Sequence, residues 1–168
     1  GFKLYGFERF IYQFISDNYP EDQIEFDISK IKLVTIDIET KSENGFPDVE
    51  SASEEILLVT IQDYTTKEII TWGTKSFNNT HDNVDYRLCN DEHHLLNSFI
   101  QWWIENTPDV VTGWNCEFFD IPYITGRLNR VLGSKLMKRL SPWGLVTQSD
   151  IVVRGRKNFI VDIGGVSV

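Results

Sequence analysis

The run from Ile31 to Thr40, IKLVTIDIET, constrains the fold more than any other part of the chain. Its β-branched and apolar residues are typical of a buried strand. Side chains two residues apart leave the same face of a strand, so Asp37 and Glu39 point together and Ile36 and Ile38 point the other way. Two adjacent carboxylates repel each other, and burying either one alone costs several kcal/mol, roughly. The usual partner of such a pair is a hard divalent cation, Mg²⁺ or Mn²⁺.

A simpler interpretation is that the two acids form the solvated face of an edge strand. The acid pair alone favours neither interpretation. Leu33 and Thr35 share the face of Asp37 and Glu39, so this face begins apolar and becomes acidic. That order favours a strand that leaves a core and enters a cleft.

The composition is that of a soluble globular domain with a sizeable core, since the chain has 168 residues, 41% of them hydrophobic. It contains no apolar window of roughly 20 residues, which a membrane span needs, and its beginning has no signal-peptide pattern. Cys89 and Cys116 form no CxxC or zinc-type spacing. We therefore expect reduced thiols in a cytoplasmic protein without a membrane partner.

Charge is distributed unevenly along the chain. Residues 127–157 carry eight basic residues and one acid, a net charge of +7, which leaves −16 for the rest of a chain whose total is −9. This pattern suits a protein that gathers cations in one place and contacts phosphate in another. The charge alone, however, favours the simpler interpretation of a solvated basic surface. The basic residues are Arg127, Arg130, Lys135, Lys138, Arg139, Arg154, Arg156 and Lys157.

Hydrophobic periodicity predicts the elements of the first half. Residues 1–30 form a lead-in with a helix that ends before Pro20. Strands are predicted at 56–64 and 68–72, with a turn at 65–67, and together with the first strand they form an antiparallel meander. Residues 74–90 are polar, and we expect them to be irregular.

The second half adds two helices and one strand. Asn90 or Asp91 should cap a helix that extends to about residue 106, a short strand follows at 109–115, and a helix begins near Ile121 and ends at Gly133. A helix, a strand and a helix after a meander predict an α/β fold in which the later strand lies parallel to the first.

Three further residues are candidates for a site. Asp120 is the third acid of interest, although Asp at a helix start is ordinarily a cap. Asn115 is at the carboxyl end of the predicted parallel strand, where ligand crevices form. Phe46 lies in the polar loop 41–48, and its ring either folds back onto the core or is offered to a base.

Taken together, these segments resemble the 3′–5′ proofreading exonuclease region of a family B DNA polymerase. The sequence around the motifs most resembles the replicative polymerases of T-even-like bacteriophages. Asp37-Ile38-Glu39 resembles the first exonuclease motif, and Asn115 with Phe119-Asp120 resembles the second, N-x-x-x-F-D. Further matching segments are Gly45 to Asp48, Thr112 to Ile124, Met137 to Pro142, and Asp162 with Gly165-Val166-Ser167.

The resemblance implies a ribonuclease H-like mixed sheet flanked by helices and truncated at its C-terminus, with 1–30 a lead-in and 31–168 a partial exonuclease domain. It implies nucleotide removal from single-stranded 3′ ends with two Mg²⁺ or Mn²⁺ ions. Asp37 would bridge both ions, Glu39 would hold the one that activates water, and Asp120 would serve the other. Two such cations, roughly 3.5–4 Å apart, stabilise the attacking and leaving oxygens.

The resemblance also implies roles in DNA binding. Asn115 would orient the strand end beside Phe119, and Phe46 would stack on the terminal base, a contact worth about 1–3 kcal/mol. From their position in the basic segment, we expect Lys138, Arg139, Arg154 and Arg156 to follow the DNA backbone. Expected partners are the other polymerase domains and a sliding clamp, in the cytoplasm of a host cell if the protein is viral.

One family motif is missing. The third exonuclease motif, Y-x-x-x-D, does not occur in this sequence. The residue four positions after Tyr64 is Glu68, and the residue four positions after Tyr123 is Arg127. We therefore expect the two-metal site to be incomplete and the segment alone to be nearly inactive, although its parent enzyme edits. The alternatives are a stand-alone DEDD-type exonuclease acting on RNA or DNA, and a non-catalytic nucleic-acid-binding module.

Overall fold

The computed structural model describes residues 10–19, 25, 27–43 and 45–168. The chain divides into two compact units, 1–30 and 31–168. In the first unit, helix α1 (Phe10–Asn18) is followed by the 3₁₀ turn η2 (Ile28–Lys30). The helix predicted in the lead-in is thus present from Phe10 onward, and its expected beginning falls outside the described residues.

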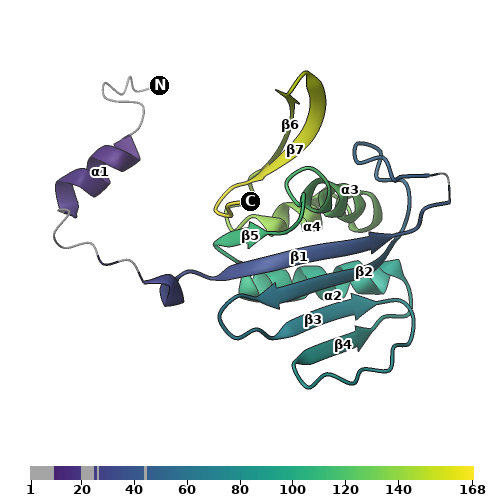
Figure 1. The fold of residues 1–168 in the computed structure, drawn as a ribbon. Coiled ribbons are helices and arrows are strands. Elements are labelled where there is room, and N and C mark those ends of the chain that lie inside the picture. Colours follow the sequence, from purple (N-terminus) through teal and green to yellow (C-terminus); the bar gives the residue numbers. More distant parts are fainter. Residues whose placement is uncertain (1–9, 20–24, 26, 44) are drawn as a thin grey trace. The chain divides into compact units, whose positions relative to one another are not determined.

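The second unit is built on a five-stranded sheet with the order β4-β3-β2-β1-β5 (Figure 1). Its strands are β1 (Leu33–Thr40), β2 (Ile56–Asp63), β3 (Ile69–Gly73), β4 (Val84–Leu88) and β5 (Val110–Thr112). Strands β1, β2 and β3 pair antiparallel, and β5 lies parallel to β1. The predicted α/β arrangement, an antiparallel meander plus a parallel strand, is confirmed.

Strand β4 corrects the expectation that residues 74–90 are irregular. It lies parallel to β3, with Ile69 opposite Val84 and Gly73 opposite Leu88. It has only five residues, in which Asp85 and Arg87 alternate with Val84, Tyr86 and Leu88, and it lies between polar segments. A short edge strand of this kind is stabilised by its neighbour and carries a weak local signal.

Helices α2 (Glu92–Asn106) and α3 (Asp120–Leu132) cover one face of the sheet (Figure 1). Asp91 caps α2, since its side chain accepts a hydrogen bond from the backbone N–H of His94, and α3 ends at Gly133, where φ is 87°. Both predicted helix ends are therefore confirmed. The core between sheet and helices contains Val34, Ile36, Val59, Ile61, Trp72, Leu95, Leu96, Phe99, Trp103, Ile124 and Leu128.

After α3, the chain forms α4 (Ser134–Met137), the 3₁₀ turn η3 (Lys138–Leu140) and a hairpin of β6 (Val146–Val153) and β7 (Arg156–Ile163). The hairpin is a separate two-stranded sheet that extends away from the five-stranded one (Figure 1). Below it, the backbone N–H of Val111 donates to the carbonyl of Ser167, so residue 167 lies beside β5. In the described part of the chain, no helix has the length and apolarity of a membrane span.

Candidate active site

Strand β1 places two of the three candidate acids. Asp37 and Glu39 are exposed on one face, whereas Ile36 and Ile38, which point to the helices, are 1% and 6% exposed. The pairing register with β2 shifts between Glu39 and Thr40. A bulge at this point re-aims side chains and ends regular pairing next to the acids.

The third acid, Asp120, is the first residue of α3 and is only 3% exposed. It does not cap the helix: the N-cap position belongs to Phe119, whose ring accepts no hydrogen bond. Instead, Asp120 Oδ1 accepts a hydrogen bond of 3.0 Å from the backbone N–H of Ile38, midway between the other two acids. Because β5 pairs with β1 only as far as Thr35, this N–H would otherwise lack a strand partner. The Asp120 side chain therefore accepts the hydrogen bond that a residue of a longer β5 would otherwise accept.

The three acids share one electrostatic environment. Burial raises the pKa of Asp120 to about 6, and repulsion by Asp37 and Glu39 adds to this rise, while the N–H of Ile38 opposes it. Asp37 and Glu39 therefore both disfavour the charge of the buried Asp120 carboxylate. This is the condition that a bound cation relieves.

The donor set suits a hard divalent cation, because all three side chains supply carboxylate oxygens. Among the residues that the structure describes, however, no three His, Cys, Asp or Glu side chains are grouped so as to hold a metal ion. Asp120 is held by Ile38, whereas Asp37 and Glu39 are exposed and can change rotamer at little cost. The chemistry thus fits, and the ligand cage is not preformed.

The segment after β5 lies directly against β1. A Cβ added to Gly113 would be 2.5 Å from the carbonyl oxygen of Ile36, so only glycine fits this approach. Asn115 is exposed and has a left-handed φ of 60°, which Asn tolerates better than most residues. Its carbonyl accepts hydrogen bonds from the N–H groups of Phe118 and Phe119, which turns the chain into α3.

Phe46 is 84% exposed, which rules out the option that it folds back onto the core. Its ring lies 5.2 Å from that of Phe119, and Phe119 lies 5.5 Å from Tyr123. The loop and the second motif are therefore joined by ring contacts. Beside them is a groove of about 400 Å³ between the loop and the β6–β7 hairpin, lined in part by Pro47, Phe118 and Phe159.

The predicted basic residues occupy two places. Lys138 and Arg139 are exposed on η3, and Arg154 is exposed at the tip of the β6–β7 hairpin. Arg156 begins β7, and its side chain lies outside the described part of the structure.

Two other members of the basic segment are paired with acids, so the segment as a whole is not the solvated basic surface that its charge alone favours. Lys157 pairs with Asp150 at 3.0 Å on the surface. Arg127 is buried and forms an ion pair with Glu92.

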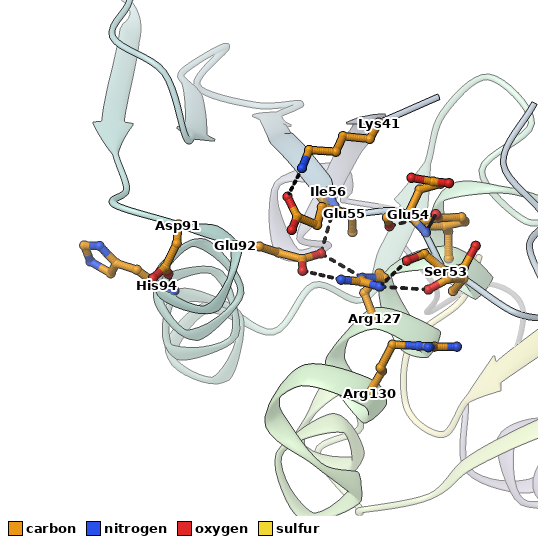
Figure 2. Close-up of polar contacts among 12 residues, drawn as sticks. Lys41, Ser53, Glu54, Glu55, Ile56, Asp91, Glu92, His94, Arg127 and Arg130 are labelled. Atoms are coloured by element: carbon orange, nitrogen blue, oxygen red, sulfur yellow. Dashed lines mark hydrogen bonds and ion pairs between the residues drawn. The ribbon is translucent and has the colours of Figure 1, made fainter. Parts of the chain in front are cut away.

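The pair of Arg127 and Glu92 is a feature that sequence reasoning missed. Glu92, in the first turn of α2, accepts a 2.7 Å hydrogen bond from Arg127 Nε at its Oε1 and also contacts Arg127 Nη2 through Oε2. The same Oε1 accepts the N–H of Ile56 at the start of β2 (Figure 2). The two side chains come from different helices, so no local sequence pattern indicates their contact.

We expect Gly113→Ala to destabilise the protein by about 1–3 kcal/mol, because the new Cβ overlaps the carbonyl of Ile36 and must push β1 and the 113–119 segment apart. Urea denaturation measures the change. Thr112→Ala, at an exposed position one residue earlier, is the control and should shift stability by less than about 0.5 kcal/mol. Equal effects of the two variants would contradict the close approach.

Two acids on one strand, a buried third acid at its edge and an exposed ring beside them define a candidate nuclease site on a mixed α/β sheet. The sequence comparison agrees, since residues 9–168 match the family described as DNA polymerase family B, exonuclease domain. The chain belongs to this family, and its fold is accordingly ribonuclease H-like. The resemblance drawn from the two motifs is confirmed.

The individual relatives that match the chain are also DNA polymerases. The chain is 28% identical to the DNA-directed DNA polymerase of Escherichia phage RB69 over 84% of its length, and 29% identical to that of Enterobacteria phage T4 over 100%. It is also 30% identical to a DNA polymerase of Thermococcus litoralis over 64% of its length. The matches cover 18% and 21% of the two phage proteins, so the chain spans about a fifth of their length.

Proposed function

We propose that residues 31–168 carry most of the 3′–5′ exonuclease domain of a replicative DNA polymerase, with 1–30 as the lead-in from its amino-terminal region. The domain removes nucleotides from single-stranded 3′ ends of DNA, so that the parent enzyme proofreads. The observation that carries this proposal is the hydrogen bond from Ile38 to Asp120, which places the buried acid of the second motif between the two acids of the first.

Asp37, Glu39 and Asp120 would hold Mg²⁺ or Mn²⁺, and a pair of these ions supplies charge stabilisation for the attacking and leaving oxygens of phosphodiester hydrolysis. The protein's own residues bind and orient the strand. Phe46 offers an exposed ring to the terminal base, and Asn115 and Phe119 approach the strand end. The exposed cations Lys138, Arg139 and Arg154 follow its phosphates, and we assign the same role to Arg156 from its place in the basic segment.

The missing tyrosine and acid of the third motif limit what the chain can do alone. We propose that it binds a cation and a DNA end but hydrolyses the end very slowly, because one ligand and the tyrosine that positions water are not in this sequence. The full-length protein would supply them, together with the other polymerase domains and a sliding-clamp contact, in the cytoplasm of the cell in which it replicates DNA.

The test is a Mn²⁺ titration followed by calorimetry at pH 7.5. We expect saturable binding that Asp37→Ala weakens by at least about tenfold, because a carboxylate ligand is lost. The matched control is Asp82→Asn, which removes one exposed negative charge in the loop before β4 and should leave the affinity unchanged. Binding that is indifferent to Asp37→Ala would instead favour a non-catalytic module with a solvated acidic strand.

A further inference from the structure

The loop that joins β1 to β2 is bound to helix α3 through its backbone. Arg127 Nη1 donates to the carbonyl oxygens of Ala52 at 3.0 Å and Ser53 at 2.9 Å. One turn further along the helix, Arg130 Nη2 donates to the carbonyl oxygen of Ser51 at 2.6 Å. Three successive loop carbonyls therefore accept guanidinium hydrogen bonds, which are stronger than those of neutral donors. Figure 2 shows Arg127 reaching this segment from the helix, with Arg130 further along the same helix.

The hydroxyl of Tyr123 continues the same series one turn before Arg127. It donates to the carbonyl oxygen of Glu54 at 2.9 Å and accepts the N–H of Glu54 at 3.1 Å. Ala52 lies directly on the helix, since a Cβ added to Gly126 would be 2.8 Å from the Ala52 methyl group. Residues 123, 127 and 130 are spaced by four and three positions, so one face of α3 binds the backbone of 51–54.

This binding extends to the exposed ring. The backbone N–H of Ser51 donates to Asp48 Oδ1 at 2.8 Å, and that of Ala52 donates to the carbonyl of Asp48 at 2.9 Å. The resulting turn ties residues 51–52 to a position two residues after Phe46. Phe119, which contacts the Phe46 ring, immediately precedes α3. The helix that binds 51–54 therefore also carries Asp120 and directly follows Phe119, whose ring contacts that of Phe46.

We propose that Arg130, together with Arg127 and Tyr123, is a positioning residue that sets Phe46 for stacking on the 3′-terminal base. This inference rests on the proposed function, because it requires that Phe46 contacts a base. Arg127 and Tyr123 are buried and contribute to folding, whereas Arg130 is exposed and its contact is with a loop carbonyl. Arg130 therefore allows the positioning role to be separated from stability.

The experiment measures binding of two single-stranded oligonucleotides with Ca²⁺ present, one ending in 2-aminopurine at its 3′ end and one ending in an abasic site. Stacking quenches 2-aminopurine fluorescence, so the probe reports the ring contact directly. Phe46→Ala should lower the affinity for the base-terminated oligonucleotide by at least about fivefold and abolish the fluorescence quench. Arg130→Met should lower the same affinity by about two- to tenfold and reduce the quench. Neither variant should change the affinity for the oligonucleotide with the abasic end.

Matched variants separate positioning from charge. Lys135→Met removes an exposed positive charge from α4 and should affect both oligonucleotides equally. Arg130→Lys, which can still donate to Ser51, should recover at least half of the quench. In the double variant Phe46→Ala/Arg130→Met, the loss should equal that of Phe46→Ala alone, because the arginine acts through the ring.

The outcomes distinguish the two proposals. If Phe46→Ala leaves the binding and fluorescence of the base-terminated end unchanged, or if neither oligonucleotide binds, the proposed stacking fails and the positioning role fails with it. Phe46→Ala can have its expected effect while Arg130→Met changes the affinities for both oligonucleotides equally, or changes neither. In that case only the positioning role is overturned.

Discussion

Asp120→Asn is expected to stabilise the protein at pH 7.5 by about 2–3 kcal/mol while removing its affinity for divalent cations. Asp120 is buried beside two other acids, and these surroundings raise its pKa to about 6 from the ordinary value of 3.8. At neutral pH, the folded protein must therefore keep a charge that its environment disfavours. Asn has nearly the same shape, is neutral, and its Oδ1 can still accept the N–H of Ile38.

The sign of the pH dependence follows from the raised pKa. Below pH 3.8, Asp120 is protonated in both the folded and the unfolded state, so its charge imposes no penalty. Between pH 3.8 and about 6, the unfolded state ionises first, and the free energy of unfolding of the wild type falls as pH rises. Above pH 6 the loss of stability is complete. It amounts to about 1.4 kcal/mol for each unit by which the pKa of Asp120 differs between the folded and the unfolded state.

Urea denaturation in EDTA at pH 3.5 and pH 7.5 measures this effect. The difference in stability between Asp120→Asn and the wild type should be near zero at pH 3.5 and largest at pH 7.5. Added Mn²⁺ should make the wild type the more stable of the two proteins, because only the wild type gains free energy from binding the ion. Glu117→Gln, an exposed acid three residues earlier, is the matched control and should show neither effect. A variant that is less stable than the wild type at pH 7.5 would contradict the proposed repulsion.

Glu92→Gln is expected to lower the free energy of unfolding by about 3–5 kcal/mol, because it leaves the guanidinium of Arg127 buried without its counter-charge. Gln retains an oxygen that can accept the N–H of Ile56, so the loss isolates the ion pair. Thermal and urea denaturation at pH 7.5 measure the change.

The control for this prediction is an exposed ion pair at the two ends of the loop that joins β1 to β2. Lys41 and Glu55 form a 2.6 Å pair whose side chains are 38% and 51% exposed, so Glu55→Gln should cost less than about 1 kcal/mol. The double variant Glu92→Gln/Arg127→Met should be more stable than the sum of the two single losses predicts, since the unpaired charge is gone. Equal costs for Glu92→Gln and Glu55→Gln would show that burial does not govern the pair.

Local pattern alone determined much of this protein. The alternation in β1 placed Asp37 and Glu39 on one face and Ile36 and Ile38 on the other, and the cap at Asp91 and the glycine at 133 set helix ends. These features depend on backbone periodicity and on residues near in sequence, which is why they were predictable. The two exonuclease motifs then indicated the family, because their order and spacing are far more specific than any single acid.

Only the tertiary structure decided how these pieces act together. Asp120 looked like an ordinary cap, yet its carboxylate accepts the N–H of Ile38, 82 positions away along the chain. Arg127 looked like part of a basic surface, yet Glu92 and two loop carbonyls surround it. Strand β4 needed β3 beside it to form. In each case the deciding partner is distant in sequence, and desolvation at the contact determines the role of a side chain whose local pattern is neutral.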